Sequence, residues 1–494
     1  MAQAHKQRQV IRARVRAERG NVFSQGGAPI VLLYPSPYRA GMSSVGFQWV
    51  LKLLREAGHQ VERAFLPDDV DAHKRDKVPL YTYETERPVG QFPTIGISLA
   101  YELELAGLIE ALQLAGIPPL RRDRGPHHPR IIMGGPLTFS NPLPAAPFVD
   151  AMLLGEAEDV LLPAFDAAVH TDGPAWLDQV AQLDGAYVPD LHGERLPEVA
   201  KASDARLPAF APIMAPEAEL SDMFLIEGER GCHRMCSFCV MRRSTNGGMR
   251  LVTPDRIMSF VPEDAARVGL VGAAISDHPQ LIGLLETLVS SGRGVGISSL
   301  RADRVARKPD IARLLREGGY KTLTVASDAA SERLRKEISK GTKEEHLLQC
   351  ARLAAEHRYK VMKVYMMVGV PGEEDEDMDE LIRFSTELSK IVPVSLGIAP
   401  FVPKRNTPLD VAPFAGIRPV ERRLKALTRG LKGRAEIRPT SARWAWVEAE
   451  LAQGGWRAGE AVYEAVRAGG KFSSYKRSLE AIDPDSRAPW RGVA

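Results

Sequence analysis

The sequence lacks several features that would assign it to a simple class. It has only four cysteines in 494 residues, too few for the disulfide framework of a secreted protein. It has no apolar run of the ~18 residues that a transmembrane helix needs. The formal net charge of +3 is small and does not indicate a nucleic-acid or membrane partner. The basic N-terminus contains no apolar segment of a secretory signal. These absences predict a cytoplasmic protein with no membrane partner.

The chain is long enough for two to four domains, and it is 44% hydrophobic and 26% charged, as is typical of soluble globular proteins. Residues 1–27 are expected to be a basic tail. In residues 28–190, short apolar runs alternate with patterns of helical spacing, which predicts a doubly wound, Rossmann-like parallel sheet. The predicted strands are residues 30–34, 60–66, 94–99, 130–135 and 151–155.

Ligands of such sheets bind beyond the carboxyl ends of the strands. In this sequence the segments "YPSPYRAGMSS", "GISLAYE", "GGP" and "GEAED" all follow predicted strands. We therefore expect one ligand site formed by these four loops. The candidate residues are Tyr34, Gly41, Ser98, Tyr101, Gly134, Gly135, Gly155 and Glu156.

A second alternation follows a predicted linker at residues 191–220. Residues 221–414 contain six strand–helix units, which suit a partial (β/α)6 barrel with its chemistry at the carboxyl ends of the strands. Residues 415–494 show only helical patterns and are expected to form a small helical C-terminal region. The predicted class is therefore α/β in two parts, followed by helices.

Three of the four cysteines lie within "ERGCHRMCSFCVMRR", just after the first predicted barrel strand. Thiolates prefer zinc, copper(I) or iron–sulfur clusters, and structural zinc needs four ligands, usually as two pairs. No second pair exists, His233 is poorly placed beside Cys232, and Cys350 lies in a helical pattern as an expected core thiol. Three thiolates on a [4Fe–4S] cluster leave one iron open. The triplet Cys232, Cys236 and Cys239 therefore indicates a catalytic cluster.

The C-x3-C-x2-C spacing, with Phe238 just before the last cysteine, resembles the radical S-adenosylmethionine (SAM) superfamily. The resemblance implies that the open iron binds the amino and carboxylate groups of SAM. One electron from the cluster then cleaves the sulfonium C–S bond, which gives methionine and a 5′-deoxyadenosyl radical. Such a cleavage requires the sulfonium to be held against the metal and shielded from water.

The resemblance also implies SAM contacts in four further segments. Many members carry Gly-Gly-Glu after the second strand to bind the SAM amino group, where this chain has "AISDHPQ". The segments "SSLRADR", "VASDAASERLRKEISKG" and "YMMVGVPGEEDED" resemble other SAM-contacting segments, with an aspartate where a glutamate is usual in the second of them. Ordinary packing at strand ends is the alternative for each. The candidate SAM contacts are Phe238, Ser276, Asp277, Ser299, Arg301, Asp328, Met367 and Gly369.

The order of a parallel domain and a radical SAM barrel resembles the cobalamin-binding branch of the superfamily, in a poorly characterised group. "PFVPKRNTP" is also similar to a segment of methylthiotransferases. Many cobalamin proteins supply a histidine to cobalt through Asp-x-His-x-x-Gly, whereas "DAHKRD" here lacks the glycine and is expected to be a solvated charged loop. The resemblance implies a [4Fe–4S] cluster and SAM as cofactors, with cobalamin as a further candidate on the eight residues named above.

Three functions follow as expectations. The first is a radical SAM enzyme that modifies an unactivated carbon, with cobalamin-dependent methylation as the leading reaction. The second is methylthiotransferase-like or other radical modification of RNA or protein without cobalamin. The third is a cluster-bearing RNA-binding module that uses the basic N-terminus and "RPVERRLKALTRGLKGR". The substrate class stays open between small molecule, protein and RNA, and a reducing partner such as flavodoxin or ferredoxin is expected.

Overall fold

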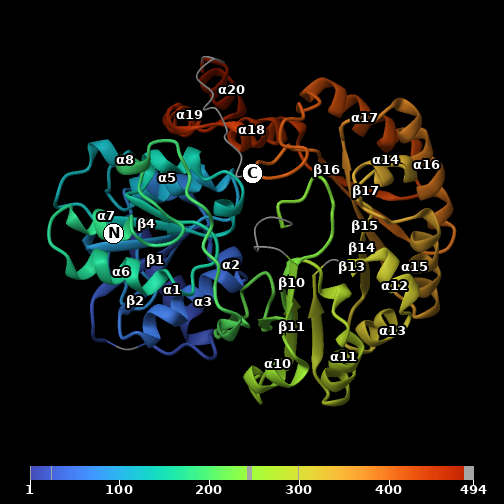
Figure 1. The fold of residues 1–494 in the computed structure, drawn as a ribbon, viewed down its shortest axis with the longest axis horizontal. Helices are drawn as coiled ribbons and strands as arrows, with labels where there is room; N and C mark the ends of the chain where they lie inside the picture. Colours follow the sequence, from blue (N-terminus) through green and yellow to red (C-terminus); the bar gives the residue numbers. More distant parts are fainter. Residues whose placement is uncertain (1, 24, 242–247, 299, 483–494) are drawn as a thin grey trace. The chain divides into compact units, whose positions relative to one another are not determined.

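The computed structural model describes residues 2–23, 25–241, 248–298 and 300–482. The chain divides into two compact units (Figure 1). Unit 1 contains residues 1–225 together with 450–494, and unit 2 contains residues 226–449. Among the described residues, no helix combines the length and the apolar character needed to cross a membrane.

The sheet of unit 1 has six strands in the order β2-β1-β3-β4-β5-β6. All neighbouring pairs are parallel except β5 and β6. Because β2 and β3 lie on opposite sides of β1, the direction of winding reverses between β1 and β3, as in the expected doubly wound sheet. The strands are β1 (Pro29–Pro37), β2 (Gln60–Leu66), β3 (Thr94–Ser98), β4 (Arg130–Gly134), β5 (Ala151–Leu153) and β6 (Ala186–Tyr187).

Helices connect these strands. In β1, Ile30 and Leu32 join residues of α3 and α6 in one hydrophobic core, while the equally buried Val31 and Leu33 point the other way. The helices of unit 1 before the barrel are α1 (Ala2–Ala17), α2 (Tyr38–Gly41), α3 (Val45–Glu56), α4 (Val70–Asp76), α5 (Glu104–Leu114), α6 (Leu161–His170), α7 (Ala175–Val180) and α8 (Pro189–His192). The 3-10 turns η1 (Val89–Gln91), η2 (Arg121–Asp123), η3 (Pro136–Phe139), η4 (Leu143–Phe148) and η5 (Asp204–Arg206) and the short strand β7 (Phe210–Ala211) complete this part.

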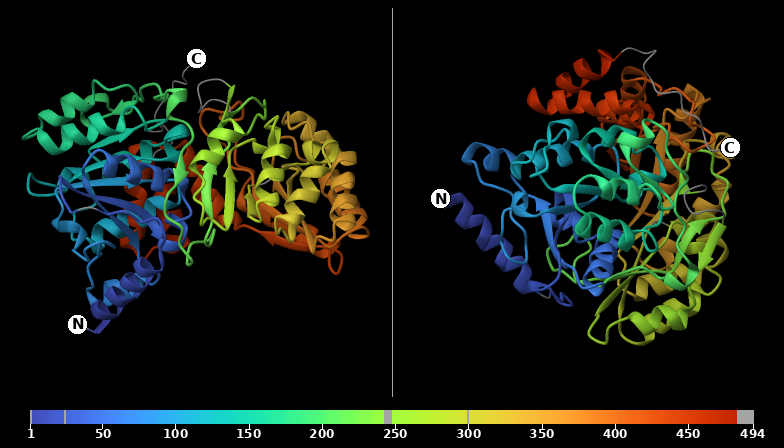
Figure 2. Two further views of the ribbon diagram at one scale, coloured as in Figure 1. Left: turned by 90° about the horizontal axis from the view of Figure 1, so that it is seen from below. Right: turned by 60° about the vertical axis from the view of Figure 1, so that its left-hand side comes forward.

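The basic N-terminal segment forms the helix α1, which packs on unit 1. Ile11 on this helix is only 2% exposed and belongs to the core. Figure 2 shows α1 at the border of the unit, with its N-terminal end directed away from the sheet. Arg12 and Arg14 on this helix form ion pairs with Glu86 and with Asp68 and Glu217. Two of the five Lys and Arg residues of α1 therefore have carboxylate partners within the unit.

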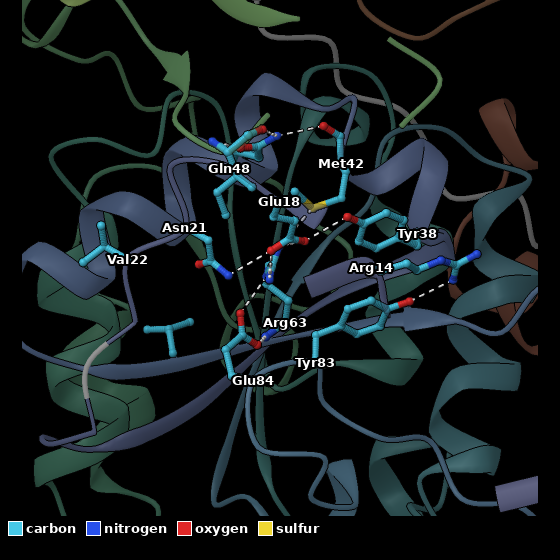
Figure 3. Close-up of polar contacts among 12 residues, drawn as sticks. Arg14, Glu18, Asn21, Val22, Tyr38, Met42, Gln48, Arg63, Tyr83 and Glu84 are labelled. Atoms are coloured by element: carbon cyan, nitrogen blue, oxygen red, sulfur yellow. Dashed lines mark hydrogen bonds and ion pairs between the residues drawn. The ribbon is translucent and has the colours of Figure 1, made fainter. Parts of the chain in front are cut away.

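A fully buried ion cluster fixes the end of this segment (Figure 3). The guanidinium of Arg63 on β2 donates two hydrogen bonds of 2.8 Å to the carboxylate of Glu18 and one of 2.7 Å to Glu84. Tyr38 and Asn21 also donate to Glu18. Burial opposes ionisation of Glu84, but the charges of Arg63 and Arg55 hold its pKa below the ordinary value. The cluster joins the N-terminal segment to the edge strand of the sheet.

The segment "DAHKRD" is not the solvated loop that the sequence suggested. It forms the helix α4, which begins after β2 and is capped by the Asp69 side chain on the Ala72 N–H. His73 is 5% exposed, and its ring nitrogens contact the Asp69 carbonyl and Gln7 of α1. The expected loop was wrong, whereas Asp71, Lys74, Arg75 and Asp76 are exposed as expected. The burial of His73 comes from α1, which is distant in sequence.

The C-terminal helices of unit 1 pack on the segment after β4. The amide of Asn141, 1% exposed, donates to the carbonyls of Leu451, Ala452 and Gly454 and so satisfies the end of α18. A Cβ on Gly459 would lie 1.9 Å from the Pro144 carbonyl oxygen, so α19 contacts η4 directly. These helices are α18 (Ala442–Gln453), which crosses the unit boundary, α19 (Trp456–Arg467) and α20 (Phe472–Glu480).

Unit 2 is a partial barrel of mainly parallel strands. One sheet contains β12, β11 and β8 as successive neighbours, and a second has the order β13-β14-β15-β16-β17. The six expected strands are present as β8 (Phe224–Glu227), β11 (Arg267–Val271), β12 (Gly294–Ile297), β14 (Thr322–Ala326), β15 (Val361–Val368) and β16 (Val394–Pro400). The sequence did not indicate β13 (Leu300–Arg301), β17 (Glu436–Pro439) or the antiparallel hairpin of β9 (Glu229–Cys232) and β10 (Gly248–Leu251).

The helices of the barrel lie outside its strands (Figure 1). Their apolar faces cover alternate residues of the strands, so that Met362, Val364 and Met366 of β15 are buried. The helices are α10 (Pro254–Phe260), α11 (Leu281–Ser290), α12 (Ala302–Arg307), α13 (Asp310–Glu317), α14 (Glu332–Glu337), α15 (Glu344–Glu356), α16 (Asp375–Ser389) and α17 (Ile417–Gly430), with the 3-10 turn η6 (Ile275–Asp277) after β11. Cys350 on α15 is fully buried, and its thiol donates to the Ala302 carbonyl, which confirms the predicted core thiol.

The buried cluster predicts a large difference between two similar substitutions. Glu18→Gln removes one of the two charges that neutralise fully buried Arg63, so we expect the free energy of unfolding to fall by about 3 kcal/mol or more. Glu86→Gln breaks the pair with Arg12, whose side chain is 51% exposed, and should lower the free energy of unfolding far less, because exposed ion pairs contribute little to stability. Urea unfolding followed by tryptophan fluorescence measures both. Equal effects would contradict the importance of the buried cluster.

Candidate functional site

The cysteine triplet lies between the two strands of a hairpin. Cys232 ends β9 and pairs with Gly248 of β10, and Cys236 and Cys239 follow in the connecting loop. The hairpin comes directly after β8, so the loop starts from the carboxyl end of the first barrel strand. This is the position that the sequence predicted, and it is the edge of a barrel at which catalytic groups are found.

The three thiols influence one another. Burial raises the pKa of Cys232 and of Cys239, and the neighbouring thiols raise both further. Bound iron reverses this effect, because a cation favours the thiolate. Among the described residues, no group of three or more His, Cys, Asp or Glu side chains is arranged to hold one metal ion. Such an ion needs all its sulfur ligands within about 2.3 Å, whereas each thiolate of a [4Fe–4S] cluster binds a different iron. Three thiolates can therefore hold three of the four irons of such a cluster.

An ion pair ties this loop to the next strand of the barrel. Arg234, between the first two cysteines, donates two hydrogen bonds of 2.7 Å to the carboxylate of Asp277 in η6. Arg304 of α12 binds the same carboxylate, whose side chain is fully buried. Burial opposes its ionisation, but the two arginines keep the pKa of Asp277 below the ordinary value. Asp277 was predicted to contact SAM, and the structure places it as the anchor of the cysteine loop.

Three further hydrogen bonds hold the same loop. The backbone N–H of Arg234 donates to Cys232 Sγ at 3.4 Å. The N–H of Ser237 donates to the Ile338 carbonyl after α14, and its carbonyl accepts from the Leu409 N–H. Phe238, beside the last cysteine, is partly buried. The conformation of the loop thus depends on segments from all around the barrel.

Three of the predicted SAM contacts lie in one network at the carboxyl ends of the strands. Arg301, 9% exposed, donates to Asp303 and to the Lys340 carbonyl. The ammonium group of Lys340 pairs with Asp328, whose carbonyl accepts from the Met367 N–H at 3.3 Å. Arg301 and Asp328 therefore each have an oppositely charged partner within the protein.

The remaining predicted SAM contacts differ in their surroundings. Ser276 is 2% exposed, and its hydroxyl accepts from the Arg301 N–H. Ser299 lies outside the described residues. Gly369 has a φ of 79°, and its N–H donates to Glu373 at 2.7 Å. Burial raises the pKa of Glu373 to about 7, although Arg423 pairs with it. Sequence patterns gave no signal for Glu373.

Glu229 on β9 is a second carboxylate that the sequence did not suggest. It lies three residues before Cys232 and is 1% exposed. Its Oε1 accepts from the Ala274 N–H at 2.6 Å, so it reaches the loop after β11 where the SAM amino group was expected. Burial raises its pKa to about 7. A glutamate at this point of the motif was visible in the sequence, but nothing local indicated where its side chain would lie.

The face of β15 that the helices leave uncovered is polar. Lys363, Tyr365 and Met367 alternate with the buried residues of this strand and so point to the inner face of the barrel. Tyr365 is 40% exposed, and Lys363 Nζ donates to its hydroxyl at 2.9 Å. A Cβ on the neighbouring Gly397 would lie 2.8 Å from the Tyr365 ring. The small residue thus makes room for the ring beneath the predicted SAM contacts.

The candidate ligand loops of unit 1 meet where the winding of its sheet reverses. Tyr34 and Ser98 lie at the ends of β1 and β3 and are buried, whereas Tyr101 is 48% exposed. The carboxylate of Glu104 joins the two loops by accepting from the Ser36 hydroxyl at 2.9 Å and the Ala100 N–H at 2.7 Å. Burial raises the pKa of Glu104. This residue was not predicted, and it fixes the loops at the expected ligand edge.

Three of the four candidate glycines have a packing role that needs no ligand. A Cβ added to Gly41 would lie 2.4 Å from the Phe65 ring. One added to Gly135 would lie 2.6 Å from the Leu99 carbonyl oxygen, and one added to Gly155 would lie 2.5 Å from the Ala200 carbonyl oxygen. At Gly134 the nearest such atom is 3.6 Å away, an ordinary contact. The carboxylate of Glu156 accepts from the Ala202 N–H at 2.8 Å. The loops are thus tightly built, and Gly134 leaves the most room.

Comparison with protein families gives two matches. A family model described as radical SAM proteins, N-terminal, matches residues 46–189, and a model described as the radical SAM superfamily matches residues 226–385. The uncharacterised protein MJ0966 of Methanocaldococcus jannaschii is 27% identical over 397 residues, which are 78% of this chain and 80% of that protein.

Two solved structures share the fold. TsrM from Kitasatospora setae, described as a radical SAM methyltransferase with tryptophan substrate and a SAM analogue bound, has a TM-score of 0.54 and 15% identity over 78% of this chain and 75% of TsrM. OxsB, described as a cobalamin-dependent SAM radical enzyme with aqua-cobalamin and SAM bound, has a TM-score of 0.50 and 12% identity over 92% of this chain and 72% of OxsB. These likenesses support the expected two-part fold.

The anchor of the cysteine loop predicts the effect of Asp277→Asn. Without this charge Arg234 loses its partner, and the loop that positions Cys232 loosens. Loss of an outer partner typically weakens metal binding about 10- to 100-fold, so we expect iron to pass correspondingly faster to a chelator after anaerobic reconstitution. Asp310→Asn, on an exposed pair with Arg313, serves as the control. Unchanged iron retention in Asp277→Asn would show that the ion pair does not hold the loop.

Proposed function

The chain belongs to the radical SAM superfamily, and on that premise we propose that this enzyme transfers a methyl group from cobalamin to an unactivated carbon. Its cofactors are a [4Fe–4S] cluster and SAM. The observation that carries the proposal is the cysteine loop at the carboxyl ends of the barrel strands, in a chain that also contains a doubly wound sheet with its reversal point at β1 and β3.

We assign the cluster to Cys232, Cys236 and Cys239. A [4Fe–4S] cluster held by these three thiolates would supply the electron for reductive cleavage of SAM. The Arg234–Asp277 pair holds the loop at one end and the backbone of Ser237 holds it further along. Such fixed partners keep ligand atoms in the geometry that a metal site requires.

The residues around the network at Arg301 and Asp328 are proposed to bind SAM. The inner-face pair of Lys363 and Tyr365 lies on the same strand as Met367 and offers hydrogen-bond donors. We infer that the substrate lies against this face and presents an acceptor group to it. An exposed ring beside a glycine also gives a flat surface on which a planar substrate can pack.

We place cobalamin at the carboxyl edge of the sheet in unit 1, where open α/β sheets bind their ligands. Tyr34, Ser98, Tyr101 and the loops after β4 and β5 would surround the corrin. Bound cobalamin supplies the methyl group. No protein histidine is assigned to cobalt, since His73 is buried against α1. TsrM, which is also described with cobalamin and a [4Fe–4S] cluster bound, and OxsB share the fold and support this assignment.

The alternatives have less support. Methylthiotransferases usually carry a second cluster on three further cysteines, and the remaining Cys350 is buried in the barrel wall. An RNA-binding role for the N-terminus would need free positive charge, but Arg12 and Arg14 are paired with carboxylates of unit 1. The enzyme would work in the cytoplasm with a reducing partner such as flavodoxin or ferredoxin.

The proposal is tested by cobalamin binding to the full chain. Anaerobically reconstituted protein is incubated with hydroxocobalamin and desalted, and its visible spectrum should retain the corrin bands at about one corrin per chain. Gly134→Phe adds a side chain at the carboxyl edge of β4, where the nearest protein atom leaves room, and should lower the retained corrin at least tenfold.

Gly125→Phe, in the loop that leads to the amino end of β4, is the matched control and should retain the corrin. The iron–sulfur absorption should be equal in all three proteins. A wild-type spectrum with iron–sulfur absorption alone would contradict cobalamin-dependent methylation and leave the radical SAM assignment in place.

A further inference from the structure

The side chain of Glu229 enters the loop that follows β11. It starts from β9, three residues before Cys232, and its Oε1 accepts from the Ala274 N–H at 2.6 Å. A Cβ on Gly272 would lie 2.3 Å from the same oxygen. The loop and the carboxylate are therefore fitted closely to each other, and residue 272 must be small for the carboxylate to enter.

The second oxygen of this carboxylate has no partner. Oε2 is buried and makes no hydrogen bond in the part of the chain that the structure describes. Burying a carboxylate oxygen without a donor is costly, and native proteins satisfy nearly all such groups. The residue as a whole is 1% exposed. The unpartnered Oε2 of Glu229 therefore indicates that a ligand with a hydrogen-bond donor binds beside it.

The loop itself offers no free carboxylate. Its own acidic residue, Asp277, is engaged by Arg234 and Arg304. After Gly272 the sequence continues with Ala273, Ala274 and "ISDHPQ", without the Gly-Gly-Glu that many radical SAM enzymes carry after the second strand. The carboxylate that reaches the Ala274 backbone comes instead from β9. This chain thus has a carboxylate within the loop after β11, but the carboxylate belongs to β9.

We propose that Glu229 provides the carboxylate that binds the ammonium group of SAM, in place of the glutamate that the loop after β11 lacks. The inference rests on the proposed use of SAM by the cysteine loop. An ammonium group offers three donors and a full positive charge, and it satisfies Oε2 while Oε1 keeps the Ala274 N–H. The ligand is thereby attached to the element that carries Cys232.

The test separates charge recognition from loop support. Glu229→Gln keeps the shape of the side chain, and its carbonyl oxygen can still accept from Ala274, but the negative charge is lost. Calorimetric titration of the cluster-loaded full chain is carried out anaerobically with SAM and with its desamino analogue, which lacks the ammonium group. Glu229→Asp keeps the charge with a shorter reach, and Glu286→Gln on the exposed side of α11 is the control. Iron content and thermal unfolding are measured for each protein.

Glu229→Gln should bind SAM about 10- to 100-fold more weakly than the wild type, as expected for loss of a charge-assisted bond, and bind the desamino analogue equally well. Glu229→Asp should lose less, and its loss should also be confined to SAM, which keeps the test decisive even if Glu229→Gln unfolds. Equal losses for both ligands would overturn the inference and leave Glu229 as a support of the loop. Unchanged SAM affinity would overturn it as well. Wild-type protein that carries iron but binds neither ligand would instead contradict the proposed function.

Discussion

The backbone hydrogen bonds of a parallel sheet stop where its strands stop, and the loops beyond them must be held by other means. In this protein, buried charged side chains do so. Glu104 joins the end of β1 to the loop after β3 in unit 1, and Asp277 joins the cysteine loop to the barrel in unit 2. Buried charges are costly unless they are paired. Each of these loops therefore has few alternative conformations, because moving it would leave a charge without its partner.

Local patterns in the sequence identified most of the strands and the cysteine triplet. Apolar runs such as residues 60–66 and 94–99 are bounded by turn residues and match β2 and, to within one residue, β3. The spacing of Cys232, Cys236 and Cys239 could be interpreted because thiolate chemistry restricts what three such residues can bind. Both signals are contained within fewer than ten neighbouring residues, which is why they could be found without a structure.

What could not be predicted depends on partners far apart in the sequence. Arg234 and Asp277 are 43 residues apart, and Glu18 and Arg63 are 45 apart; no periodicity connects them. The pairing of Asp277 with Arg234 was therefore not anticipated, and neither was the burial of His73 in "DAHKRD" by α1. Glycines posed a related problem. A glycine at a strand end is equally consistent with a ligand and with a close backbone neighbour, and only the structure shows the Leu99 carbonyl against Gly135.

The division of unit 1 into two stretches of sequence has a consequence for how the chain is made. Residues 1–225 emerge from the ribosome first, but α19 and the residues that Asn141 binds come only after the entire barrel has been synthesised. Domains generally begin to fold as they emerge. Residues 1–225 can therefore fold while the surface around Pro144 is still uncovered, and more than two hundred further residues are added before α19 is made. During that interval the apolar surface is open to chaperones and to aggregation. The final docking of α19 thus couples completion of unit 1 to the end of translation rather than to its beginning.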